Sequence, residues 1–197
     1  MSQSLRGKKI AVLVANGFSE KDLTLTQKEV LSSGAQIRIV SMDAGLVNSW
    51  NDDSAQGNWG LNFASDQVLS RALAADFDML LVPGGQRSLE KLQLTGHTRR
   101  FIRGFVEADK AVVFYHDAIA LLAFAECANG LSVSGPESLR SELEAQGAHW
   151  DDQALTQSGA VMSGISDEKT REDFTAAAAQ FLIEQASAQA MPQAVAA

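Results

Sequence analysis

The sequence predicts an α/β protein built on a doubly wound parallel sheet with helices on both faces. Three observations predict it: short apolar runs that end in Gly, Pro or Asn, helical patterns between these runs, and connections long enough for strand–helix–strand crossovers. Continuous apolar runs are typical of strands that are buried on both faces. Since such sheets bind ligands at the carboxyl ends of their strands, we expect the functional site there.

The first strand–helix–strand unit is predicted at the amino-terminal end. Residues 8–15 (KKIAVLVA) form an apolar run that ends at Asn-Gly. Ser19 and Asp22 have the spacing of a capping box, and a helical period follows as far as residues 33–34. The alternating residues 36–41 (QIRIVS) predict the second strand.

A long irregular segment separates this unit from the third strand. Residues 42–65 lack a regular period and are rich in Gly, Asn and Asp, which predicts an excursion over the surface. The third strand, 77–82, is followed by Pro and then by Gly84 and Gly85. The two glycines either bring backbone N–H groups to a ligand or simply end a buried strand. Residues 99–108 are predicted to form a helix.

The fourth strand, residues 111–115 (AVVFY), runs directly into a helical pattern at 116–123. Such a junction forces one residue into a cramped turn, as in a nucleophile elbow, where backbone N–H groups stabilise negative charge. An apolar strand followed by a helix is nevertheless common in α/β proteins. The remaining predicted elements are a helix over 136–147, a short strand pair around 158–159 and a helix over 167–185.

The whole chain, residues 1–197, is predicted to be a single domain. Its ordered core is expected to span about residues 7–187, and the Ala- and Gln-rich tail 188–197 is expected to be flexible. No linker or internal repeat divides the sequence.

Composition excludes several classes of partner. The net charge of −8 and the pI near 4.8 argue against nucleic acid. No apolar run approaches the roughly 18 residues of a membrane span, so we expect no membrane partner and a cytoplasmic location. Cys127 is the single cysteine and is expected to be a packed side chain. The three histidines lack a metal-ligand spacing, and neither a metal nor another cofactor is predicted.

Several segments, in their order along the chain, resemble the PfpI family of intracellular proteases and amidases, within the class I glutamine-amidotransferase-like superfamily. They are ANGFSEKDL at 15–23, VNSWN at 47–51, LVPGG at 81–85 and SLRSELEAQGAHW at 138–150. The resemblance covers nearly the whole ordered chain. It implies a flavodoxin-like three-layer sandwich, and a homodimer or larger assembly with its site near a subunit interface.

The resemblance also implies a set of site residues. The family combines a Cys-His pair at the elbow with a carboxylate after the first strand and often a second carboxylate near the Pro-Gly-Gly loop. His116 matches the family's histidine, while Tyr115 stands at the cysteine position and Asp117 replaces a small residue. Asp22 matches the first carboxylate, and Glu90 falls near the second although the preceding loop is one residue longer. We therefore take these five as candidate site residues.

These departures bear on the chemistry. The pKa of a cysteine, about 8.5, falls readily beside a helix N-terminus, whereas that of a tyrosine starts near 10. Since nearby carboxylates would raise it further, Tyr115 is expected to stay a neutral phenol. Asp117 is either a helix cap or a group that blocks the oxyanion position, and Asp22 is either a capping-box acid or a site acid.

Two functions remain open. In the first, the protein has lost cysteine-dependent protease, amidase or deglycase activity and keeps its pocket for a small molecule or for a stress-related structural role. In the second, it is a hydratase, lyase or amide hydrolase in which Tyr115 is the general acid, with His116 and a carboxylate from Asp22 or Glu90. Gly84, Gly85 and Asp117 are the predicted binding residues in either case.

Overall fold

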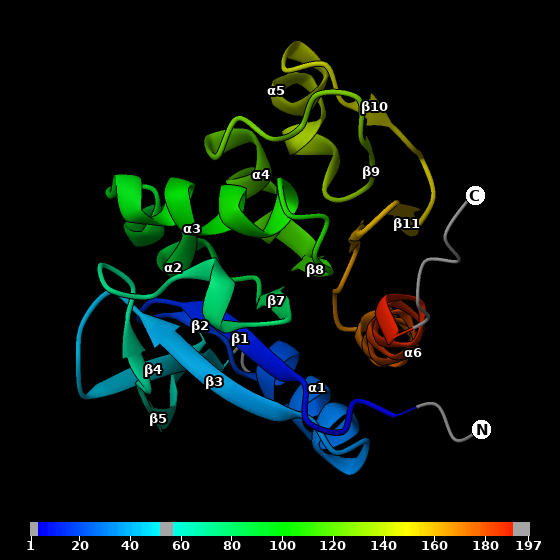
Figure 1. Ribbon diagram of the computed structural model, residues 1–197. Coiled ribbons are helices and arrows are strands. Elements are labelled where there is room, and N and C mark those ends of the chain that lie inside the picture. Colours follow the sequence, from blue (N-terminus) through cyan, green and yellow to red (C-terminus); the bar gives the residue numbers. More distant parts are fainter. Residues whose placement is uncertain (1–3, 52–56, 191–197) are drawn as a thin grey trace.

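A seven-stranded sheet forms the middle layer of the molecule in the computed structural model, which describes residues 4–51 and 57–190 (Figure 1). Every neighbouring pair of strands is parallel except that of the edge strand β11. In spatial order the strands are β11 (Leu155–Ser158), β12 (Val161–Gly164), β8 (Val112–Tyr115), β7 (Met79–Val82), β1 (Lys9–Val14), β3 (Gln36–Ser41) and β6 (Gln67–Val68).

Helices cover both faces of the sheet, and a separate apolar core lies between the sheet and the helices on each face. Helices α1 (Glu20–Ser32) and α6 (Arg171–Ala190) bury their apolar side chains in one core, next to each other in Figure 1. The other face is covered by α2 (Gln86–Leu92), α3 (Gly96–Val106), α4 (Ala120–Phe124) and α5 (Arg140–Ala145). The described residues also contain three short 3₁₀ helices: η1 (Ala74–Asp76), η2 (His116–Ile119) and η3 (Glu137–Leu139). The predicted three-layer, flavodoxin-like sandwich is confirmed.

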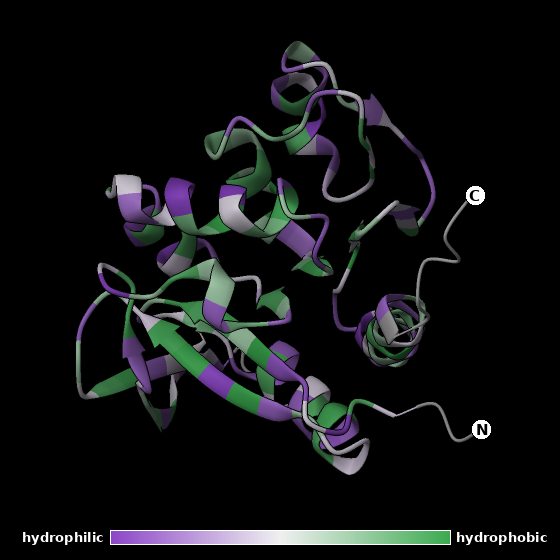
Figure 2. Cartoon of the chain, in the orientation of Figure 1, coloured by the Kyte–Doolittle hydropathy of each residue, from purple (hydrophilic) through white to green (hydrophobic). Residues whose placement is uncertain are grey.

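Burial explains why the central strands have continuous apolar sequences. All four residues of β7 and of β8 are buried, because helices pack on both sides of them. Strand β3 lies nearer the edge, and in Figure 2 hydrophobic and hydrophilic residues alternate along it. Its first half is correspondingly more exposed than its second.

The expectation that residues 42–65 lack regular structure is wrong, although much of the described part of this segment is exposed. This segment contains β4 (Leu46–Asn51) and β5 (Asn58–Ala64), which pair antiparallel, and β4 also pairs with the short strand β2 (Phe18–Ser19). Strand β5 has no buried residue, so pairing with β4 rather than burial of one face holds it. A second small sheet joins β9 (Ser132–Val133) to β10 (His149–Trp150).

The predicted start of the first helix is confirmed. Ser19 is the N-cap of α1, and its hydroxyl accepts a hydrogen bond of 3.4 Å from the backbone N–H of Asp22. Strands β1, β3, β7 and β8 also lie where the sequence predicts them. Helix α2 was not predicted, because the sequence Gly84-Gly85 and the polar residues that follow indicate a loop.

At the carboxyl-terminal end, α6 extends beyond the predicted helix and includes residues 188–190 of the expected flexible tail. Residues 191–197 of that tail lie outside the described residues. Among the helices of the described segments, none combines the length and apolar character that crossing a membrane requires.

Candidate functional site

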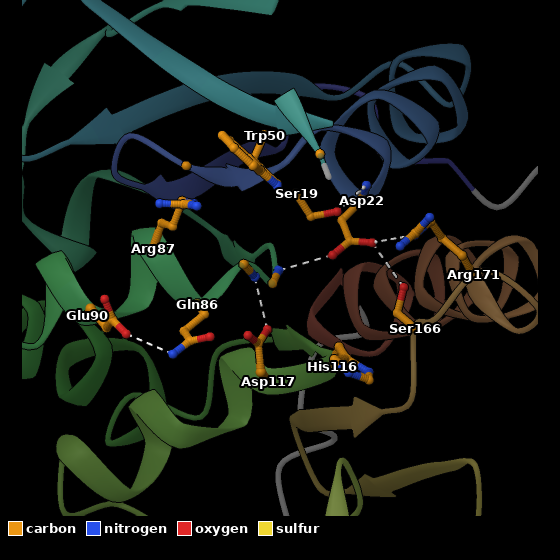
Figure 3. Close-up of a pocket in the computed structure, with 14 residues that line it drawn as sticks. Ser19, Asp22, Trp50, Gln86, Arg87, Glu90, His116, Asp117, Ser166 and Arg171 are labelled. Carbon is orange, nitrogen blue, oxygen red and sulfur yellow. Dashed lines mark hydrogen bonds and ion pairs between the residues drawn. The ribbon is translucent and has the colours of Figure 1, made fainter. Parts of the chain in front are cut away.

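A pocket of about 710 Å³ opens at the carboxyl ends of the parallel strands, where the fold class predicts a site. Four chain segments form it: those that follow β1, β7, β8 and β12, together with part of the β4–β5 hairpin (Figure 3). The lining residues are Gly17, Ser19, Asp22, Trp50, Gly57, Gly84, Gly85, Gln86, Arg87, Glu90, His116, Asp117, Ser166 and Arg171.

Asp22 lies at the back of this pocket in a dense set of polar contacts. The N–H of Gly84 donates to its Oδ2 at 3.0 Å, and the hydroxyl of Ser166 donates to its Oδ1 at 3.0 Å. Arg171 Nε donates to the same Oδ1 at 3.1 Å. Burial raises the pKa of the Asp22 carboxyl, against the opposing effects of Arg171 and these hydrogen bonds. The residue thus serves both the first turn of α1 and the pocket.

The Gly84-Gly85 backbone lies between two carboxylates. While Gly84 donates to Asp22, the N–H of Gly85 donates to Asp117 Oδ1 at 2.9 Å. Gly85 has φ 118°, and a Cβ there would lie 2.7 Å from the carbonyl oxygen of Gly17. Only glycine therefore lets the loop approach this closely. Both amides that could face a ligand donate to acids of the chain itself.

His116 is the residue at the strand-to-helix junction with a strained backbone. Its φ is +50°, a conformation that costs about 1–2 kcal/mol for a residue with a Cβ atom. His116 lines the pocket, and among the described residues its buried Nδ1 has no hydrogen-bond partner. By its backbone, His116 is the residue that the elbow presents.

Tyr115 is not the residue that the elbow presents, and this corrects the sequence-based assignment. Its side chain is completely buried, packs against Phe174 with ring centroids 4.8 Å apart, and does not line the pocket. Its Oη lies 2.5 Å from Thr26 Oγ1. Burial, with a smaller effect of Asp22, raises the pKa of the phenol, which is the direction that favours the predicted neutral form. A role as general acid in the pocket is excluded by this position.

Glu90 and Arg87 lie on α2 at the rim of the pocket. Glu90 is exposed, and its Oε1 accepts a hydrogen bond of 2.8 Å from Gln86 Nε2. The guanidinium carbon of Arg87 lies 4.2 Å from the centroid of the Trp50 ring. Glu90 is thus part of the pocket but stands apart from the contacts around Asp22 (Figure 3).

The structure brings together the candidates Asp22, Glu90, His116 and Asp117 with the predicted glycines, and adds residues that sequence reasoning missed. Ser166 and Arg171 follow β12, whose place beside β8 the sequence does not reveal. One signal was present: Arg171 is a cation in the first turn of a helix, where the helix dipole disfavours it. Such a residue indicates a specific acidic partner.

The pocket therefore combines an imidazole, a buried acid paired with a guanidinium, and a second acid bound to a backbone amide. These groups can bind a polar molecule or move a proton. Across the described segments, no group of three His, Cys, Asp or Glu side chains is placed to hold a metal ion. Cys127 lies outside the pocket, and its thiol donates to the carbonyl of Ala125 at 3.3 Å.

Comparisons with known proteins agree on one family. The family model described as DJ-1/PfpI matches residues 8–180. YraA of Bacillus subtilis is 28% identical over 169 residues, which cover 86% of this chain and 93% of YraA. Protein/nucleic acid deglycase 2 of Escherichia coli is 26% identical and covers 75% of this chain and 82% of its own. The crystal structure of Drosophila melanogaster DJ-1beta has a TM-score of 0.75 at 18% identity, over 92% and 94% of the two chains, which shows the fold alone.

Proposed function

Since this chain belongs to the DJ-1/PfpI family and presents a histidine at its elbow, we propose that it binds a small molecule without thiol-dependent chemistry. In this proposal it lacks the protease, amidase or deglycase activity that depends on a cysteine. The pocket around Asp22, His116 and Asp117 then serves as a binding site. The observation that carries the proposal is that a histidine, His116, and not a cysteine, has the positive φ of the turn residue at the elbow.

The remaining thiol does not replace the missing one. Cys127 follows α4 and lines neither the main pocket nor the pocket beside it that His116 also lines. Burial raises the pKa of its thiol, which lowers the fraction of reactive thiolate at neutral pH. This supports a packing role for Cys127.

The backbone amides of the loop support the same proposal. Acyl transfer needs N–H donors aimed at the position where an oxyanion develops. The N–H groups of Gly84 and Gly85 instead donate to the carboxylates of Asp22 and Asp117. A tetrahedral oxyanion would have to displace a negative side chain from these donors, which strongly disfavours it.

A second candidate function is acid–base chemistry on a small carbonyl or amide compound, as in a hydratase, lyase or amide hydrolase. It is favoured by His116, which lines the pocket and whose buried Nδ1 has no partner among the described residues. The raised pKa of Asp22 would let that carboxyl hold a proton. Here His116 is the base and Asp22 the partner acid, in place of Tyr115.

Turnover assays separate the two functions. For the binding function we expect no hydrolysis of peptides, amides or aldehyde adducts above the buffer rate, and a rise in Tm with ligands from a small-molecule library. Turnover that disappears in both His116→Ala and Asp22→Asn, and persists in Tyr115→Phe, would support the acid–base function instead. Turnover that iodoacetamide abolishes would contradict both.

Thiol reactivity tests which residue the elbow presents. In a Cys127→Ser background, we expect the thiol introduced by His116→Cys to react with iodoacetamide about tenfold or more faster than that introduced by Tyr115→Cys. His116 lines the pocket, whereas Tyr115 is completely buried and does not line it. Mass spectrometry measures both rates, and equal rates in denaturant provide the control. Faster modification of the Tyr115→Cys variant would show that the elbow presents Tyr115 and not His116.

The homodimer expected from the family resemblance stays part of the proposal. Sedimentation velocity of the purified chain measures it directly, and a monomer at all concentrations up to the micromolar range would contradict it.

A further inference from the structure

Arg87 makes two contacts with other parts of the chain at the mouth of the main pocket. Its side-chain stem packs on Gly17 so closely that a Cβ on that glycine would lie 2.5 Å from Arg87 Cβ. Its guanidinium lies over the face of Trp50, with 4.2 Å between Arg87 Cζ and the ring centroid. Trp50 in turn makes an edge-on contact with Trp59, whose ring centroid is 5.3 Å away. An arginine held in this way loses little conformational entropy when it binds a ligand.

The charge of Arg87 is not neutralised by another side chain in the described part of the chain. Other arginines, including Arg38, Arg103 and Arg140, form ion pairs with Asp or Glu, and Arg171 of the same pocket pairs with Asp22. No such pair involves Arg87 within residues 4–51 and 57–190. A guanidinium stacked on an aromatic face keeps its N–H donors in the plane of the group, where they can hold a carboxylate or phosphate by two hydrogen bonds.

The other charges of the pocket restrict where an anion can bind. Asp117 and Glu90 line the same pocket and repel an anionic group, while Arg171 already pairs with Asp22. Among the described residues that line the pocket, Arg87 is therefore the cation available to a ligand. The rest of such a ligand must be neutral or positively charged where it faces Asp117 and Glu90.

We propose that Arg87, stacked on Trp50, selects ligands that carry a carboxylate or phosphate group at the pocket mouth. The inference rests on the proposed binding function and adds the chemical class of the ligand. Because Arg87 is exposed, its contribution is moderate and is screened by salt.

Matched probes test this. N-acetylglycine, its neutral analogue N-acetylglycinamide, and methyl phosphate are titrated into the full chain, and the backbone amide NMR signals of the pocket are followed. We expect the acid to bind about fivefold more tightly than the amide in wild type, with a smaller ratio at high salt. Tighter binding of methyl phosphate than of N-acetylglycine would identify the phosphate as the preferred anion.

Variants locate the effect. Arg87→Met keeps the apolar stem and should remove the preference for the acid, whereas Arg87→Lys should retain part of it. Arg71→Met, an exposed arginine outside the pocket, is the matched control for the loss of one charge and should leave the preference unchanged. Equal binding of acid and amide to wild type, or an equal loss in Arg71→Met, would overturn the inference alone. Failure of acids and amides alike to bind would overturn the proposed binding function and the inference with it.

Discussion

Truncation of Tyr115 to alanine is expected to lower the free energy of unfolding by about 3–5 kcal/mol. Among the described residues, Tyr115 has the largest of the completely buried side chains. Its ring contacts Phe174 of α6 and belongs to the core between the sheet, α1 and α6. Removal of the ring leaves a cavity that the surrounding helices cannot fill without moving. Urea denaturation of the purified variant measures the loss.

Tyr115→Phe is the control that separates the ring from the hydroxyl. It keeps the packing and removes only the contact with Thr26, whose hydroxyl still donates to the carbonyl of Asp22 at 2.7 Å. We expect it to cost about 1 kcal/mol and to leave ligand binding unchanged. A Tyr115→Ala variant with the stability of wild type and lost binding would contradict the structural role and return Tyr115 to the site.

The error at the elbow has a physical cause in the strand itself. Along β8, Val112 and Phe114 face one core, while Val113 and Tyr115 face the other. Since both faces are buried, the alternation leaves no polar residue to mark the end of the strand. The positive φ of His116 is a backbone property that no residue type there signals. That the turn residue is His116 and not Tyr115 therefore follows only from the structure.

Other parts of the site were predictable for a definite reason. Asp22, Gly84, Gly85, His116 and Asp117 follow strands that the sequence reveals, and parallel strands end at one edge of the sheet. The catalytic or binding role of each remains a prediction.

What the sequence missed depends on contacts between distant segments. Ser166 and Arg171 reach the site only because β12 lies next to β8 in the sheet. Trp50 reaches it through the β4–β5 hairpin, whose strand β5 shows no alternation of buried and exposed residues. Neither arrangement follows from local periodicity.

The second large effect is expected from Arg171. Replacement by methionine should destabilise the protein by about 3 kcal/mol or more near neutral pH. The side chain of Asp22 is 2% exposed and that of Arg171 is 15% exposed, so water can hardly replace the lost cation. The first turn of α6 also contains Glu172 and Asp173, which suit its dipole better than Arg171 does. The ion pair with Asp22 therefore explains the arginine there.

The loss of stability in Arg171→Met should depend on pH, and the burial of Asp22 determines the direction of this dependence. The folded-state pKa of Asp22 is already above its ordinary value of 3.8, and removal of Arg171 raises it further. A folded state that binds the proton more tightly than the unfolded chain is favoured below the unfolded pKa and loses this advantage as pH rises through the folded pKa. Arg171→Met should therefore be least harmful near pH 4 and most harmful above the raised pKa. Denaturation series from pH 4 to 8 measure this.

Two further variants identify Asp22 as the titrating group. Asp22→Asn combined with Arg171→Met removes the buried carboxylate, so the double variant should show a smaller pH-dependent loss than Arg171→Met alone. Arg140→Met breaks ion pairs between exposed side chains and should have a much smaller effect. If Arg171→Met is equally destabilising from pH 4 to 8, the buried pair cannot be the cause. The loss would then arise from the packing of the Arg171 side chain, which is 15% exposed, and not from its charge.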